Sequence, residues 1–147
     1  MGTSSNQSNG SEIVNNNDFS EVLQYFLAGL GLPLTPRLDY LNEGEDLVIY
    51  ALPGGKVEDE DMAGTQILSL PFEIAIKSKD QQKVNATLWK INTELSKIGL
   101  ELPSLNNSYT FLSLKVETPS LNDVNDQDYY IYLLDLQATI EVERSLN

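Results

Sequence analysis

The sequence predicts an α+β domain, a two-layer sandwich in which a mainly antiparallel four-stranded sheet carries two helices on one face, in the order α-β-β-α-β-β. Two observations predict this class. Three stretches alternate apolar and polar residues with a period of two over all or part of their length, which is typical of strands with one buried face, and a fourth is a short β-rich run. Two other stretches place apolar residues three and four positions apart, which is typical of helices packed on a core. Long connections between the strands favour antiparallel pairing, with both helices on the same apolar face.

Composition limits the chemistry that the protein can perform. The chain has 147 residues, 41% of them apolar, which suffices for one domain with a core. It contains no cysteine and no histidine, which excludes disulfides, metal sites built from these residues and histidine-dependent catalytic triads. Gly54-Gly55-Lys56 lacks the spacing of a phosphate-binding loop, and no carboxylate pair lies in an apolar pocket pattern. We therefore expect no cofactor, no metal site and no enzymatic activity.

The charge balance is strongly acidic. Nine lysines and arginines stand against 22 aspartates and glutamates, which gives a net charge of −13. A basic footprint for binding nucleic acid is absent. Two interpretations stay open: an ordinary solvated surface, or a surface that repels a polyanion such as DNA or meets a basic partner. No window reaches the roughly 18 apolar residues of a membrane span, and no signal-peptide pattern begins the sequence, so we expect a cytosolic protein.

Residues 1–17 predict a flexible N-terminal arm before a single α+β domain of residues 18–147. The arm is small and polar apart from Ile13 and Val14, so it has too little apolar surface to order itself. It is either a flexible tail or an arm that becomes ordered on a neighbouring subunit, with these two residues as anchors.

The first helix and the first strand follow the arm. Residues 19–30 place their apolar side chains on one helical face, Asp18 or Ser20 is in position to cap that helix, and Gly31 ends it. After a connection that contains two prolines, residues 46–52 form a short apolar run, which predicts the first strand.

A loop of 12 residues, 53–64, follows the first strand. Hairpin loops usually contain two to five residues, so a longer one is more often functional or a contact in an assembly. Its acidic run has no spacing of metal ligands, so solvation is favoured over cation binding. The contact residues predicted in this loop are Pro53, Gly54, Gly55, Glu58, Asp59, Glu60 and Asp61.

The chain is organised around a second strand that runs directly into a helix. This strand is predicted over residues 64–76. From residue 68 onward every second side chain is apolar and predicts one buried face: Leu68, Leu70, Phe72, Ile74 and Ile76. Pro71 cannot donate a hydrogen bond to a neighbouring strand, so we expect it at an edge or in a bulge, and as a contact residue.

The second helix is predicted over residues 81–98, capped by Asp80 and ended by Gly99. Its buried stripe contains Val84, Leu88, Ile91, Leu95 and Ile98. Trp89 lies beside this stripe, where tryptophan serves either as boundary packing or as a contact between subunits.

The third and fourth strands complete the domain. In the third, residues 109–118, Leu112, Leu114 and Val116 are expected on the core face. Residues 119–128 form a second long loop that faintly resembles a calcium loop but lacks its central glycine and distal glutamate. The contact residues predicted there are Asn122, Asp123 and Asp126.

The fourth strand, which begins near Tyr130, is apolar on both faces in its first half and on one face in its second half. Either a helix covers each side of that first half, or a neighbouring chain does. Long strands with exposed edges need protection, which an oligomer would supply.

Several segments in a fixed order resemble the minor capsid or tail terminator proteins of long-tailed phages of Gram-positive bacteria. The segments are a strand ending in Leu52-Pro53-Gly54-Gly55-Lys56, an acidic stretch leading to Met62-Ala63-Gly64-Thr65, the run Pro71 to Gln81, the helical Thr87 to Ile91, and a closing strand that ends in Glu141-Val142-Glu143. The resemblance spans residues 18–143, and the arm is longer and more polar than in that family.

The resemblance implies a structural role in the virion, assembled in the cytoplasm of the bacterial host. A tail terminator forms a homo-oligomeric, hexameric ring that caps the tail tube protein and docks the tail to the head-tail connector or stopper protein. DNA passes through its acidic channel without specific binding, and no membrane is involved. The alternatives are another neck or tail component, such as a head-completion or tail-tube protein, or a non-viral acidic binding module.

Overall fold

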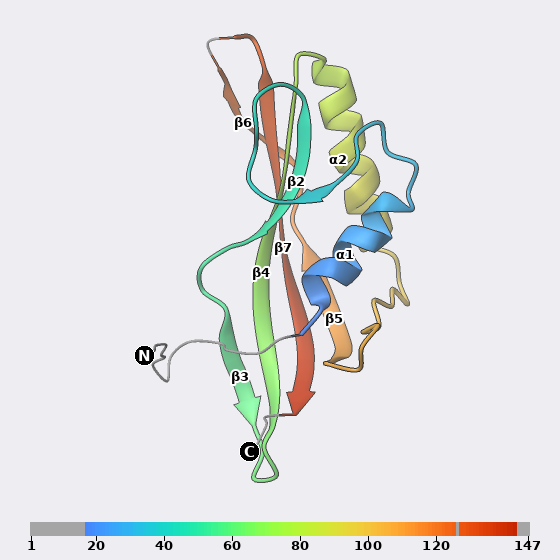
Figure 1. The fold of residues 1–147 in the computed structure, drawn as a ribbon, viewed down its shortest axis with the longest axis vertical. Helices are drawn as coiled ribbons and strands as arrows, with labels where there is room; N and C mark the ends of the chain where they lie inside the picture. The colour runs from blue at the N-terminus through green and yellow to red at the C-terminus, as the bar shows by residue number, and fades with distance from the viewer. Residues whose placement is uncertain (1–16, 126, 144–147) are drawn as a thin grey trace.

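The computed structural model describes residues 17–125 and 127–143 of the chain (Figure 1). The predicted arm, apart from Asn17, and the predicted contact residue Asp126 lie outside these described residues. The elements are α1 (Phe19–Ala28), β1 (Arg37–Leu38), β2 (Asp46–Ala51), β3 (Lys56–Glu60), β4 (Thr65–Ser78), α2 (Gln81–Leu95), β5 (Thr110–Val116), β6 (Ser120–Val124) and β7 (Tyr130–Glu143).

Two long antiparallel strands, β4 and β7, form the centre of the sheet. They are paired over 14 residues each, from Thr65 opposite Glu143 to Ser78 opposite Tyr130. The strands β2 and β3 pair antiparallel with the other side of β4, and β5 and β6 pair antiparallel with the other side of β7. The short β1 is parallel to β2.

The predicted α+β class is confirmed, but the predicted four-stranded sheet and its simple element order are wrong. The described residues form one mixed seven-stranded sheet. The additional strands β3 and β6 lie inside the two segments predicted as long loops, and every residue of both strands is exposed. Because neither strand buries a face, neither shows the alternation of apolar residues by which strands are recognised.

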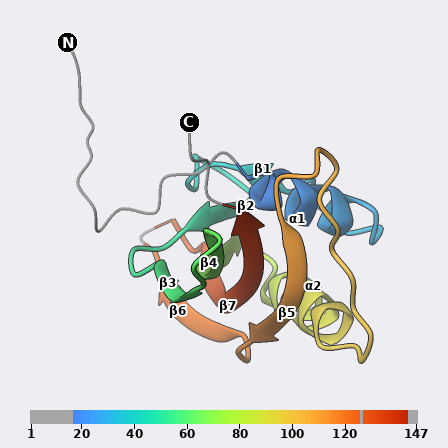
Figure 2. The same ribbon diagram turned by 90° about the horizontal axis from the view of Figure 1, so that it is seen from below.

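Both helices pack on one face of the sheet, as predicted (Figure 2). We call this the helix face. Phe19 of α1 packs on Phe72 of β4, with ring centroids 5.5 Å apart, and edge-to-face on Tyr109 at 5.7 Å. The α2 stripe and the alternate residues of β4 and β7 complete the core: Val84, Leu88, Ile91, Leu95, Leu68, Ile74, Ile76, Leu134, Leu136, Ala138 and Ile140.

Two predicted core residues are exposed, each for a local reason. The pairing of β5 with β7 shifts between Phe111 and Ser113, and this bulge turns Leu112 outward, so that Phe111 packs against the core in its place. Ile98 is fully exposed because α2 ends at Leu95, before the predicted last turn.

Pro71 lies in a central strand and not at an edge or in a bulge of its own strand. Its carbonyl accepts a hydrogen bond from the Leu52 amide at 2.9 Å, at the position where β2 has ended and β3 has not begun. In antiparallel pairing the amide and carbonyl of one residue point to the same side. The missing donor of Pro71 therefore faces this gap, and the pairing with β7 loses nothing.

The loop of residues 39–45 covers part of the second face of the sheet, near β2 (Figure 1). Arg37 fixes the loop through two hydrogen bonds to Asp46, of 3.0 and 2.5 Å. The Tyr40 ring packs on Tyr50, and Lys77 donates to the Asn42 carbonyl. The apolar second face near the start of β7 thus receives part of its cover from the chain's own loop, and not from a helix as one alternative predicted.

Asp18 joins the start of α1 to the segment before β5. It occupies the N-cap position, but its carboxylate makes no capping hydrogen bond. It accepts instead from the Ser104 hydroxyl at 2.7 Å, the Leu105 amide at 2.9 Å and the Ser108 hydroxyl at 3.1 Å.

No helix in the described part of the chain is long and apolar enough to cross a membrane.

Replacing Asp18 by asparagine is expected to lower the free energy of unfolding by about 1–3 kcal/mol, because hydrogen bonds to a charged, partly buried acceptor are weakened. Urea unfolding followed by circular dichroism measures the change. Asp123→Asn, on the exposed β6, is the control and should shift the unfolding midpoint little. Equal stability of the Asp18 variant and the wild type would contradict this role.

Candidate assembly surface

The predicted acidic contact loop is an edge strand followed by a tight turn. Glu58, Asp59 and Glu60 lie on the exposed β3, beside β4. Asp61 accepts hydrogen bonds from the amides of Ala63 and Thr65, both at 2.9 Å, so its carboxylate holds the turn together. Pro53, Gly54 and Gly55 form the link between β2 and β3, where Gly54 has a φ of 105° that favours glycine.

Carboxylates gather at the end of the sheet that carries β3. Strand pairing places Asp59 opposite Ile67, and Ile67 opposite Glu141; Thr65 at the end of the ladder lies opposite Glu143. These rows and the turn together carry Glu58, Asp59, Glu60, Asp61, Glu141 and Glu143. Lys56 forms an ion pair with Glu58 at 3.8 Å. We call this region the acidic end of the sheet.

The second predicted contact segment lies at the other end of the sheet. Asn122 and Asp123 belong to β6, where Asp123 pairs with Ile131 of β7. Along β7, Ile131 and Val142 are 11 residues apart, which corresponds to about 36 Å. The structure therefore does not bring the two predicted contact segments together: they lie at opposite ends and on opposite sides of the sheet.

Trp89 and Pro71 belong to neither segment. Trp89 on α2 is 44% exposed. Its side of the helix faces the connection between β5 and β6, because Asn92, one turn later on that side, donates to the Glu117 carbonyl at 2.7 Å. A contact between subunits remains a prediction for Trp89. Pro71 lies inside the sheet, as described above.

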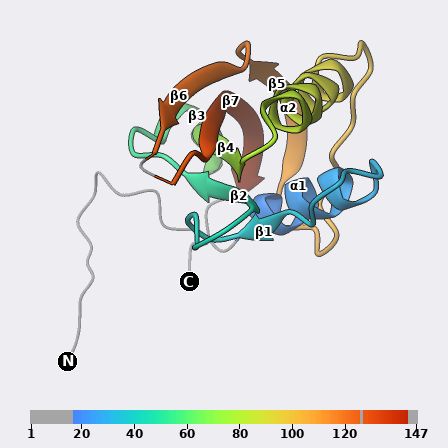
Figure 3. The same ribbon diagram turned by 90° about the horizontal axis from the view of Figure 1, so that it is seen from above.

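Sequence reasoning missed the polar face of the sheet opposite the helices. Tyr50, Glu73 and Asp135 are direct neighbours across β2, β4 and β7, and the Tyr50 hydroxyl donates to Glu73 at 2.5 Å. Further along, Gln137 donates to the Ser69 hydroxyl. We call this side of the sheet, with Tyr50, Glu73, Asp135, Gln137, Thr139 and Glu141 above the buried Ser69, the open face, because no helix of the described residues covers it (Figure 3).

Two carboxyl groups face each other on the open face. A hydrogen bond with Glu73, partial burial and the negative charge of Glu73 raise the pKa of Asp135 to about 6. Burial and the hydrogen bond to Glu73 also raise the pKa of Tyr50, which keeps its hydroxyl protonated as a donor. The signal in the sequence was the polar position of Glu73 and Asp135 in the period-two pattern, but only the strand register places them together.

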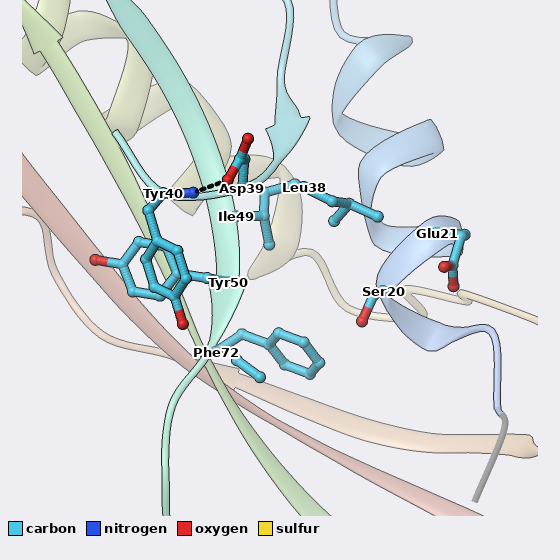
Figure 4. Close-up of a pocket in the computed structure, with 9 residues that line it drawn as sticks. Ser20, Glu21, Leu38, Asp39, Tyr40, Ile49, Tyr50 and Phe72 are labelled. Atoms are coloured by element: carbon cyan, nitrogen blue, oxygen red, sulfur yellow. Dashed lines mark hydrogen bonds between the residues drawn. The ribbon is translucent and has the colours of Figure 1, made fainter. Parts of the chain in front are cut away.

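A shallow pocket of about 370 Å³ lies between α1, β1 and β2 (Figure 4). Ile49 and Phe72 supply apolar surface, and Ser20, Glu21 and Asp39 supply polar groups. The carboxylate of Asp39 accepts from the Tyr40 amide at 2.8 Å and so stabilises the loop of residues 39–45. Within residues 17–125 and 127–143 no group of three or more acidic side chains could hold a metal ion. The pocket offers no set of groups that would perform a reaction.

Comparison with protein families gives one match over most of the chain. The family model described as "Bacteriophage tail terminator protein" matches residues 20–142. The match covers all of α2 and β4, α1 without its first residue and β7 without its last residue. A search of curated proteins found no match.

As the pH rises from about 4 to about 6, the titration of Asp135 is expected to lower the free energy of unfolding. Its pKa of about 6 in the folded protein exceeds the ordinary value of 3.8, so the folded protein binds more protons in this range, and raising the pH favours unfolding. Asp135→Asn removes this dependence and should be more stable than the wild type at pH 7, by up to about 1 kcal/mol because the group is partly solvated.

Urea unfolding of both proteins at several pH values tests this expectation. Asp123→Asn again serves as the control, since it removes one carboxylate from an exposed edge. The difference between Asp135→Asn and the wild type isolates Asp135 from other titrating groups. A difference that stays constant from pH 4 to pH 7 would show that the two carboxyl groups do not interact.

Proposed function

The chain belongs to the bacteriophage tail terminator family, and from this premise we propose that it forms a hexameric ring that caps the finished tail tube and joins the tail to the head connector. Proteins of this family are structural components of the phage tail and not enzymes. The partners proposed here are further copies of the chain, the tail tube protein and the connector or stopper protein. The ring is assembled in the host cytoplasm from copies of this single α+β domain.

The open face is the observation that supports a passage for DNA. We propose that the subunits are oriented in the ring so that one face of the sheet points towards the axis and the other points outward. The helix face is occupied by α1 and α2. The open face presents the carboxylates of Asp59, Glu73, Asp135 and Glu141, together with the lysines Lys56, Lys77 and Lys115 and neutral polar groups. We place the open face towards the axis, with the helices outside. The carboxylates then repel the DNA phosphates and keep passing DNA from adhering to the wall.

The edges of the sheet support assembly through several copies. The acidic β3 borders one side of the sheet, and β5 and β6 border the other side. A contact between different surfaces of successive copies is heterologous, and such contacts form rings when the rotation closes. The predicted contact residues of β3 and β6 lie on these two sides. The same features would suit a tail-tube or head-completion protein, which belongs to the same virion, and position in the virion separates these roles.

Electron microscopy of tails made without this protein tests the proposal. Tails that grow beyond the normal length, or that fail to join heads, are expected because the tube end is then uncapped. Restoring the protein from a plasmid should restore normal length and joining. Tails of normal length attached to heads would contradict the proposed role. If the protein, labelled in wild-type tails, were found on many stacked rings, it would be a tube protein.

Reversing charge on the open face is expected to slow DNA passage while leaving the virion complete. With Glu73→Lys and Asp135→Lys together, lysines at the wall attract phosphates, so that DNA release and infectivity should fall several-fold. The matched control is Glu21→Lys with Glu101→Lys, which makes the same charge change on exposed positions of the helix side.

The neutral pair Glu73→Gln and Asp135→Asn separates charge from folding. It removes the same carboxylates without adding positive charge and should release DNA nearly as the wild type does. Circular dichroism confirms that each variant folds. Unchanged DNA release in the folded double-lysine variant would place the open face away from the DNA path.

A further inference from the structure

The acidic end of the sheet has two exposed edges that differ in charge. There the strands follow the order β3, β4, β7, β5, and no further strand of the described residues pairs with the outer side of β3 or β5. β3 carries three carboxylates, Glu58, Asp59 and Glu60, and one lysine, Lys56, whereas the one charged residue of β5 is Lys115. Exposed strand edges are templates for pairing with another chain unless something blocks or occupies them.

Lys115 is unusual among the basic side chains. Arg37, Lys56, Lys83 and Lys97 form ion pairs, and Lys77 and Lys79 lie over the Tyr129 ring. Within the described part of the chain, Lys90 and Lys115 have no such contact. Of these two, only Lys115 lies on a strand edge. In a chain with a net charge of −13, this lysine leaves a positive charge on the β5 edge that an acidic edge of another copy could complement.

Strand directions allow the two edges to meet in successive copies. Each neighbouring pair in the order β3, β4, β7, β5 is antiparallel, so β3 and β5 run in opposite directions. When β5 of one copy lies beside β3 of the next copy in the same orientation, the two strands are antiparallel. The alternation of directions then continues from copy to copy without interruption.

The register that pairs the charges also pairs apolar residues. Lys115 of β5 pairs with Gln137 of β7. Asp59 of β3 pairs with Ile67 of β4, which in turn pairs with Glu141 of β7. Glu141 lies four residues after Gln137, so the two charged residues are offset by four residues along the sheet. A stagger of four residues between copies brings Lys115 opposite Asp59, both on the side of the open face. Because four is even, side chains keep their faces.

The same stagger acts on the helix face. Val116 pairs with Leu136 of β7. Val57 pairs with Leu68 of β4, which pairs with Ile140 of β7. Leu136 and Ile140 are again four residues apart. Val57 is 42% exposed in the single chain, so pairing with Val116 would bury apolar surface. A stagger of this kind is also what a sheet needs in order to close on itself.

We propose that β3 of one copy pairs antiparallel with β5 of the next copy, with Lys115 opposite Asp59 and Val116 opposite Val57. This inference rests on the ring of the proposed function and names the surfaces that form it. A symmetric pairing of β3 with β3 would bring together two strands that each carry three carboxylates and one lysine, and β6 would bring Asp123 against β3. The charges therefore select β5 as the partner of β3.

Disulfide trapping tests the pairing, because the chain has no cysteine of its own. Opposite residues of antiparallel strands have Cβ atoms about 4.5–5.5 Å apart, close to the reach of a disulfide. In one chain β3 and β5 are separated by three strand spacings, about 14 Å, so a bond within the chain is excluded. The full-length protein with Asp59→Cys and Lys115→Cys is oxidised and examined on a non-reducing gel.

We expect a ladder of covalent multimers from the double variant, and a dimer when the two single variants are mixed. Each single variant alone should give no dimer. The matched control, Asp59→Cys with Asp123→Cys, should form no ladder. Without oxidation, Lys115→Glu should weaken association about tenfold, because it places like charges opposite each other, and Asp59→Lys in the same chain should restore it.

Three results would overturn the pairing. They are a ladder in the Asp59 and Asp123 control only, a dimer from Asp59→Cys alone, or a protein that stays monomeric at its highest soluble concentration. A ladder through β6 would leave the ring and the terminator role intact while reassigning the edge. Normal tails in the absence of the protein would instead remove the terminator role, even if β3 and β5 do pair.

Discussion

The antiparallel ladder between β4 and β7 is the constraint on which the rest of the structure depends. Fourteen consecutive residues of each strand are paired, so one register decides the face and the neighbours of every side chain in both strands. It puts Phe72 under Phe19 on the helix face and Glu73 beside Asp135 on the open face. It also tolerates Pro71, because that residue directs its missing donor to the other side of β4.

The ladder is longer than either helix, although the core on its helix face still reaches Leu68, Ile140 and Val142 at the acidic end. A strand of 14 residues spans about 46 Å, whereas the 15 residues of α2 span about 22 Å. The helices therefore cannot cover the sheet along its whole length. At the acidic end the backbone pairing with β3 and β5 holds β4 and β7 in place, and the side chains that face solvent are free to carry charge.

The sequence predicted what depends on burial and missed what depends on pairing. The stripe of α2 and the alternate apolar residues of β4 follow from local periodicity, because each meets a continuous core. β3 and β6 are held by hydrogen bonds to β4 and β7 and bury no face, so their residues look like loops. The outward turn of Leu112 comes from a bulge, and the Glu73–Asp135 pair comes from strand register; neither leaves a local signal in the sequence.

The charge of the protein opposes the assembly that we propose, and this opposition has a use. Copies with a net charge of −13 repel one another beyond their contacts, and a single Lys115–Asp59 pair near the surface offsets only part of that repulsion. Free copies therefore pair weakly and reversibly, which oxidation can still trap at high protein concentration, but they are discouraged from extending into sheets or tubes of their own. The end of a tail tube would add contacts to each copy and hold neighbours in register. The ring would then close on the end of the tail tube, which is the place where a terminator is needed.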